Sequence, residues 1–228
     1  MPSKTIKINA MDGHKLNGYL ALPPGPPTVG LLVLQEIFGV TAHIRKVTDE
    51  FAARGFLALA PALFDRLKPG TELAYSQFDQ ARDLMQQVSI DDVATDLSAS
   101  VAALRGLLLP PGNKVGAIGY CWGGAIADLA ACRTDVNAAV SYYGRANLNW
   151  LAEKPRCPVL YHFGGKDQLI PPEIIAQIRA GRPTSDAWVY PDAGHGFNCD
   201  DRPEFHEPSA RLALDRTLAF FSQHLDLP

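Results

Sequence analysis

Cysteine is scarce in this sequence, with only Cys121, Cys132, Cys157 and Cys199 in a chain of 228 residues. No two of them form a Cys-x-x-Cys pair, which argues against a structural zinc site and against a thioredoxin-like redox centre. A chain of this length buries a sizeable core without cross-links. We therefore expect four free thiols rather than two disulfides.

Long apolar runs and blocks of like charge are also missing. No run approaches the roughly 20 residues that span a bilayer, and the first ten residues hold no apolar core of signal-peptide length. The net charge is −3, without a basic cluster or an acidic tail, so nothing favours nucleic acid or a membrane surface as partner. The histidines are scattered, and we expect no metal and no cofactor. The sequence predicts a cytoplasmic protein that is a monomer or a weak homodimer.

Short apolar runs alternate with longer amphipathic stretches along the whole chain. The runs are nearly all apolar, as in parallel strands that helices cover on both faces: residues 29–34, 56–60, 115–118, 138–142, 159–163 and 187–190. Helices are expected at about 41–54, 72–87, 91–108, 122–132, 172–181 and 206–224. Residues 5–8 and 16–20 predict an antiparallel hairpin at a sheet edge. This order predicts a single α/β domain over residues 1–228, with a mainly parallel twisted sheet and helices on both faces.

A single cysteine stands between glycines in the sequence GYCWGG, residues 119–124, where a buried run meets an expected helix. Strand, Gly-x-Cys-x-Gly and helix form the nucleophile-elbow pattern, with cysteine in place of the usual serine. Gly119 and Gly123 lack a Cβ, which lets strand and helix approach closely. The helix that begins near Trp122 aims backbone N–H groups at the Cys121 sulfur and favours a thiolate. A buried cysteine in a glycine-rich turn is the alternative interpretation of this motif by itself.

An elbow nucleophile needs a histidine base and an acid that orients the base, and in this fold the chain order is nucleophile, acid, histidine. Asp167 lies in the loop after the run 159–163. His195 lies between two glycines in the loop after the run 187–190. Taken singly, Asp167 also fits a turn-capping residue and His195 a surface loop. Their order and their positions at strand ends together predict a triad of Cys121, His195 and Asp167.

At this point the sequence resembles the dienelactone hydrolase family of the α/β-hydrolase fold. Five motifs carry the resemblance in family order over nearly the whole chain: QEIFGV at 35–40, GYCWGG at 119–124, YYG at 142–144, GGKD at 164–167 and AGHGF at 193–197. The resemblance implies the same triad. It also implies hydrolysis of an ester or enol lactone through a cysteinyl thioester on Cys121.

Residues after the run 29–34 are expected on the same rim as the elbow. The resemblance implies that Glu36 lies beside the cysteine and helps to generate the thiolate when substrate binds. The backbone N–H groups of Ile37 and Trp122 are the expected oxyanion hole, worth roughly 2.7–4 kcal/mol each by analogy with measured donors. Four aromatic residues at strand ends are candidates for an apolar pocket lining, with core packing as the alternative: Phe38, Tyr142, Tyr143 and Phe197.

The substrate-binding part of the resemblance has a gap. Family members that cleave dienelactone hold its carboxylate with two arginines, and the matching positions here are Phe78 and Cys199. Arg82 and Arg202 lie nearby and are candidates for that role, with a solvated surface position as the alternative. We expect a small ester or lactone substrate that carries a carboxylate. A hydrolase of broader scope for esters and thioesters, or a non-catalytic binding protein on the same fold, stays open.

Overall fold

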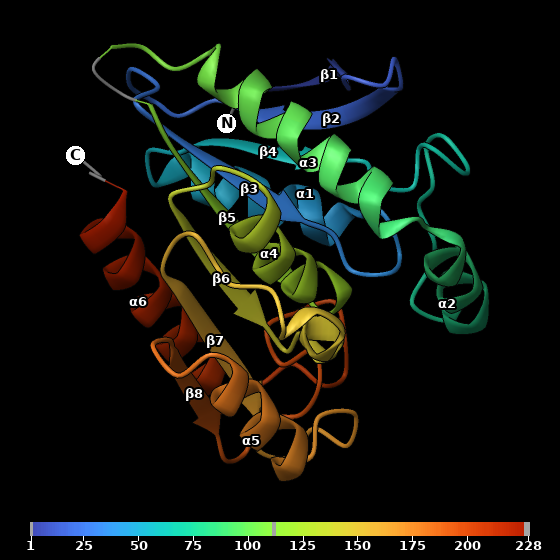
Figure 1. Ribbon diagram of the computed structural model, residues 1–228, viewed down its shortest axis with the longest axis vertical. Coiled ribbons are helices and arrows are strands. Elements are labelled where there is room, and N and C mark those ends of the chain that lie inside the picture. The colour runs from blue at the N-terminus through green and yellow to red at the C-terminus, as the bar shows by residue number, and fades with distance from the viewer. Residues whose placement is uncertain (1, 111–112, 226–228) are drawn as a thin grey trace.

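The computed structural model describes residues 2–110 and 113–225, and the eight strands in these ranges form one sheet (Figure 1). The strands are β1 Ser3–Asn9, β2 Lys15–Ala21, β3 Val29–Leu34, β4 Leu57–Pro61, β5 Lys114–Tyr120, β6 Ala138–Tyr142, β7 Val159–Gly164 and β8 Asp186–Tyr190. Their spatial order is β1-β2-β4-β3-β5-β6-β7-β8. The predicted hairpin β1–β2 is antiparallel and joins β4 in antiparallel fashion, whereas β4, β3 and β5 to β8 pair in parallel.

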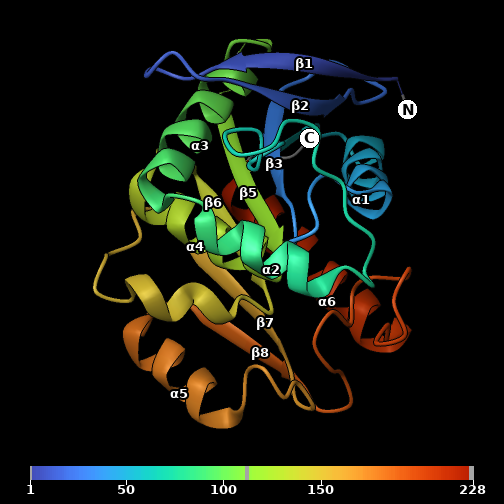
Figure 2. The same cartoon turned by 90° about the vertical axis from the view of Figure 1, so that its right-hand side faces the viewer.

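Helices cover both faces of the sheet. They are α1 Ala42–Ala53, α2 Phe78–Gln87, α3 Ile90–Arg105, α4 Trp122–Arg133, α5 Pro172–Gly181 and α6 Glu207–His224, with a short 3-10 helix, η1, at Arg145–Trp150. Figure 2 shows α1 and α6 on one face, and α3, α4 and α5 on the other. This arrangement confirms the predicted fold class. None of the helices within residues 2–110 and 113–225 combines the length and the apolarity needed to cross a bilayer.

The helix predicted at 72–87 begins six residues late, at Phe78. Glu72 forms an isolated antiparallel bridge with Gly39, and the Leu73 N–H donates to the Phe38 carbonyl at 2.9 Å. Gly39 has a φ of +90°, and a Cβ there would lie 2.0 Å from the carbonyl oxygen of Thr71. Because this backbone pairs with the loop after β3, it is not available for helical hydrogen bonds. The pairing also fixes the loop that carries Glu36 and Ile37.

The run at 187–190 was expected to be covered on both faces, and this expectation is wrong. It forms β8, the edge strand, in which Trp188 is 42% and Val189 37% exposed. The guanidinium of Arg216, on α6, lies 3.7 Å from the centre of the Trp188 ring. An arginine therefore covers this apolar surface in place of a helix face.

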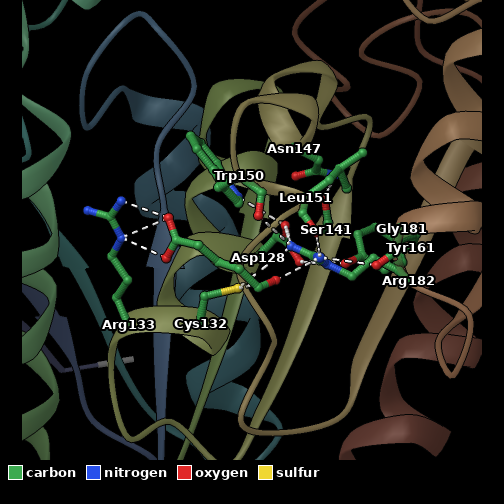
Figure 3. Close-up of polar contacts among 11 residues, drawn as sticks. Asp128, Cys132, Arg133, Ser141, Asn147, Trp150, Leu151, Tyr161, Gly181 and Arg182 are labelled. Carbon is green, nitrogen blue, oxygen red and sulfur yellow. Dashed lines mark hydrogen bonds and ion pairs between the residues drawn. The ribbon is translucent and has the colours of Figure 1, made fainter.

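A buried ion pair joins α4 to the end of α5 and to η1 (Figure 3). Asp128 and Arg182 are 0% and 3% exposed, and two Arg182 nitrogens donate to the Asp128 carboxylate at 3.1 and 2.9 Å. The Trp150 indole and the Tyr161 hydroxyl donate to the same carboxylate at 2.9 and 2.5 Å. Another Arg182 nitrogen donates to carbonyls in the segment 151–153, both at 3.0 Å. These contacts anchor the carboxyl end of η1, whose amino end reaches the cavity described below.

Candidate active site

Cys121 lies in the sharp turn between β5 and α4 with a φ of 56° and a ψ of −118°. A non-glycine residue with positive φ is strained, and surrounding packing must hold it there. A Cβ on Gly119 would lie 1.9 Å from the Gly123 carbonyl oxygen, and a Cβ on Gly123 would lie 2.3 Å from the Leu34 carbonyl oxygen. Glycine is therefore required at both positions, and the close approach places the start of α4 against the end of β3.

The structure brings together Cys121, His195 and Asp167, the three residues selected from the sequence. The Nε2 atom of His195 lies 3.2 Å from the Cys121 Sγ atom, and its Nδ1 atom lies 2.8 Å from Asp167 Oδ2. Asp167 is 4% exposed, and its other oxygen accepts hydrogen bonds from the N–H groups of Leu169 and Ile170 at 2.8 and 3.2 Å. The carboxylate is thus fixed by its own loop and can orient the imidazole.

The surroundings of the His195 imidazole favour its charged form. Burial opposes this charge, but a negative charge on Cys121 and hydrogen bonds to Asp167 and Cys121 together outweigh it and raise the pKa of His195 to about 10. The side chain is 13% exposed, so solvent screens these interactions only partly. An imidazolium on His195 and a thiolate on Cys121 therefore stabilise each other.

Glu36 forms a second buried charged pair, with Arg202. Glu36 is 1% exposed, and its Oε1 atom lies 3.4 Å from an Arg202 terminal nitrogen. Its Oε2 atom is buried without a hydrogen-bond partner among the described residues. Gly196 has a φ of +78°, and a Cβ there would lie 3.0 Å from the same Arg202 nitrogen. The glycine after the histidine therefore makes room for the guanidinium.

A cavity of about 350 Å³ opens over the sulfur and the imidazole. Its wall is mostly apolar, with Ile37, Phe38, Phe78, Met85, Trp122, Tyr143, Ala146 and Leu169. The charged residues in the wall are Arg82, Arg145, Arg202 and Glu204. Both arginines that the sequence offered as candidates thus face the cavity, Arg82 with a side chain 50% exposed and Arg202 with one 16% exposed.

Two predicted pocket residues, Tyr142 and Phe197, lie outside this lining, and the structure corrects them. The Tyr142 hydroxyl lies 2.8 Å from the Thr217 Oγ1 atom on α6, on the other side of the sheet. Phe197 is fully buried, with its ring 5.4 Å from that of Tyr143. Tyr143 does line the cavity, directly after β6 and with a φ of +40°.

The proposed oxyanion-hole residues, Ile37 and Trp122, both line the cavity beside Cys121. Within residues 2–110 and 113–225, neither backbone N–H group donates a hydrogen bond to another part of the chain. Two N–H groups in this position are available to a substrate oxygen.

Sequence reasoning missed Met85, Arg145, Ala146, Leu169 and Glu204 as lining residues. Arg145 carried a usable signal, because it follows the YYG motif at the carboxyl end of β6. Residues at that end of parallel strands share one rim of the sheet. The other four lie on α2, on η1 or in loops, where no strand-end rule places them.

The remaining thiols lie away from the reacting groups. All four cysteines are free, as predicted. Cys199 is fully buried and lies 3.1 Å from the Tyr75 hydroxyl, and burial together with the charge of Glu36 raises its pKa to about 12. In residues 2–110 and 113–225, no three His, Cys, Asp or Glu side chains are grouped to hold a metal ion.

Comparisons with known proteins identify the family. The dienelactone hydrolase family model matches residues 16–225. A carboxymethylenebutenolidase from Pseudomonas putida is 33% identical over 230 residues, covering 97% of each chain. A crystal structure from Klebsiella pneumoniae, described as a "Putative Dienelactone Hydrolase", has a TM-score of 0.85 at 29% identity and covers 98% of this chain and 100% of its own. A Pyrococcus furiosus esterase, with a TM-score of 0.70 at 18% identity and 98% and 93% coverage, shares the fold. The chain therefore belongs to the dienelactone hydrolase family and is a carboxylic ester hydrolase with the α/β-hydrolase fold.

Proposed function

We propose that this hydrolase cleaves a carboxylate-bearing ester or enol lactone through a covalent thioester on Cys121. The observation that carries the proposal is the unbroken chain of contacts from Cys121 through His195 to Asp167, at 3.2 and 2.8 Å, beneath a cavity with arginines in its wall. Nucleophile, base and orienting acid within hydrogen-bond reach are the geometry that covalent acyl transfer requires.

In the first half of the reaction, the Cys121 sulfur attacks the substrate carbonyl carbon and the carbonyl electrons move to its oxygen. The N–H groups of Ile37 and Trp122 stabilise that oxyanion. When the oxyanion collapses, the C–O bond to the alcohol or enol breaks and the His195 imidazolium gives its proton to the leaving oxygen. A thioester remains, and in a lactone the leaving oxygen stays attached to the acyl chain.

In the second half, a water molecule attacks the thioester carbonyl, and neutral His195 takes one of its protons. The C–S bond then breaks, which releases a carboxylic acid and returns the thiolate and the imidazolium. Asp167 keeps the Nδ1–H of the ring directed away from the sulfur throughout both steps. All protons are thus accounted for by His195 and water.

Arg82 and Arg202 are our candidates for holding the substrate carboxylate. Arg202 is the better supported of the two, because its guanidinium is largely buried, lines the cavity and contacts Glu36. A substrate carboxylate on Arg202 competes with Glu36 for the same cation. Glu36, with one oxygen already unpartnered, is then the carboxylate that can accept a proton or repel a nearby charge as substrate binds.

The alternative function for this site is a broader hydrolase of small esters and thioesters, which would show no preference for acids.

The decisive experiment compares wild type with Cys121→Ala and Cys121→Ser on 4-nitrophenyl acetate and on a lactone acid with its methyl ester. We expect Cys121→Ala to bind but not turn over, and denatured wild type quenched during turnover to carry one acyl mass on the peptide that contains Cys121. Equal turnover in Cys121→Ala would exclude the thioester. A wild type that does not prefer the acid over the methyl ester would favour the broader hydrolase.

A further inference from the structure

The cavity holds more positive charge than one substrate carboxylate needs. Its wall contains the guanidinium groups of Arg82, Arg145 and Arg202 but only one carboxylate, that of Glu204. The arginines come from separate elements: α2, η1 and the loop between β8 and α6. Each can therefore meet a different part of a bound molecule.

The three arginines differ in how far the protein already neutralises them. Arg202 contacts Glu36 at 3.4 Å and Glu204 at 3.3 Å. Arg82 has an exposed partner, Asp79, at 3.3 Å. Arg145 contacts no carboxylate within residues 2–110 and 113–225, where its single polar contact is the hydrogen bond from Nε to the Leu169 carbonyl at 3.0 Å.

That one hydrogen bond leaves both terminal nitrogens of the Arg145 guanidinium without a partner among the described residues. Arg145 is exposed, and its Nε–H donates one hydrogen bond that restricts the planar group, while both terminal nitrogens stay available as a bidentate donor for a carboxylate. The other end of η1 is anchored through Trp150 to the Asp128–Arg182 pair (Figure 3). This partial restriction reduces the freedom that the guanidinium loses when it binds an anion.

We propose that Arg145 forms a second anion subsite, and that the preferred substrates are esters or lactones that carry two carboxylates. This inference rests on the proposed function of the same cavity. One carboxylate takes the place offered by Arg202 and Arg82, and the other pairs with Arg145 beside Leu169. Arg145 is then a residue that determines specificity and takes no part in the bond-breaking steps.

The test uses three 4-nitrophenyl esters with related acyl chains, corrected for spontaneous hydrolysis: the butanoate, the monoester of pentanedioate and the terminal monoester of propane-1,2,3-tricarboxylate. They carry zero, one and two carboxylates. The readout is the kcat/KM of each acid divided by that of the butanoate, because changes in the catalytic contacts alone cancel in this ratio. Wild type is expected to favour the dianion over the monoanion by about tenfold, the value of one charge-assisted pair.

Three variants separate charge from structure. Arg145→Gln is expected to lower the dianion ratio about tenfold. Arg145→Lys keeps the charge but loses the bidentate geometry, so its loss should be smaller than that of Arg145→Gln. Arg211→Gln, an exposed arginine on α6, is the matched control and should keep the wild-type ratios. An unchanged ratio in Arg145→Gln, an equal loss in Arg145→Lys, or a wild type that does not favour the dianion would overturn the proposal. Failure of the thioester mechanism itself is distinguished by Cys121→Ala, which would then hydrolyse the butanoate as fast as wild type.

Discussion

Two of the buried acid–arginine pairs, Asp128–Arg182 and Glu36–Arg202, are built differently. Asp128 receives four hydrogen bonds, and Arg182 donates to it and to surrounding carbonyls (Figure 3). Glu36 has one contact, to Arg202 at 3.4 Å, and its second oxygen has no partner among the described residues. The first pair is saturated and supports packing between helices, whereas the second keeps unused hydrogen-bonding capacity next to a cavity. A buried charge left partly unsatisfied points to a functional site.

The largest expected effect comes from the catalytic contacts beside the unsaturated pair. His195→Ala removes the group that delivers and accepts the proton, so kcat should fall by about 10²–10⁴-fold. Asp167→Asn should lower kcat by a similar or smaller factor. The double variant should lose much less activity than the product of the two single losses, because both residues serve one proton transfer. Steady-state kinetics on one ester measures all three variants, and strictly additive losses would separate Asp167 from the unit.

The saturated pair should govern stability instead. Asp128→Ala leaves the Arg182 charge buried and unpaired, which should reduce the free energy of unfolding by about 3–5 kcal/mol. Urea denaturation measures the loss. The double change Asp128→Leu with Arg182→Met removes both charges and should recover part of the loss, since the Trp150 indole and the Tyr161 hydroxyl still lack their acceptor. A loss below about 1 kcal/mol in the single variant would contradict the comparison.

Sequence reasoning succeeded where a pattern ties chain order to position. Parallel strands and crossover helices place the carboxyl ends of all the parallel strands on one rim, so Cys121, Asp167 and His195 could be expected to lie together from their positions in the chain. The late start of α2 could not be foreseen, since it depends on pairing between Glu72 and a glycine more than thirty residues away in the chain.

The directions of the side chains at the carboxyl ends of the strands could not be predicted from the sequence either. Tyr142 and Tyr143 are neighbours of the same type, and the sequence does not tell which of the two faces the cavity. Arg202 illustrates a different limit. It does not match the family position, yet it reaches the buried Glu36 because the loop after His195 turns at Gly196.

Raising the pH should remove part of the contribution of the catalytic contacts to stability. The pKa of His195 is raised from 6.5 to about 10 in the folded chain, so its stabilising effect is complete below pH 6.5 and is lost as the pH rises through about 10. We expect the difference in unfolding free energy between wild type and His195→Ala to shrink from pH 6 to pH 10.5. A difference that grows over this range would contradict the charged imidazole.

Glu36→Gln tests the unsaturated pair itself. The amide keeps the shape and removes the charge. The free energy of unfolding should change by less than about 1 kcal/mol, because Arg202 is partly exposed and keeps Glu204 as a partner at 3.3 Å. Turnover should fall more than binding, with kcat about tenfold lower. The measurement is kcat and KM for a lactone acid, and a Gln variant as active as wild type would remove Glu36 from the mechanism.

The smallest effect is expected at Cys199, a buried thiol close enough to Glu36 and Arg202 for their charges to act on it. Its pKa is raised to about 12, as is that of Cys157, and that of Cys132 is raised to about 11, in each case mainly by burial. At pH 8 fewer than about one in a thousand of these groups is a thiolate, and only the thiolate reacts with iodoacetamide. One equivalent of iodoacetamide should therefore label Cys121 and inactivate the enzyme. Cys199→Ser should keep kcat/KM within about twofold, because the 3.1 Å contact of Cys199 is with Tyr75, which does not line the cavity. Labelling of Cys199 in the folded chain, read by peptide mass, would show that the region behind Glu36 opens to solvent and that the two buried pairs differ in mobility as well as in saturation.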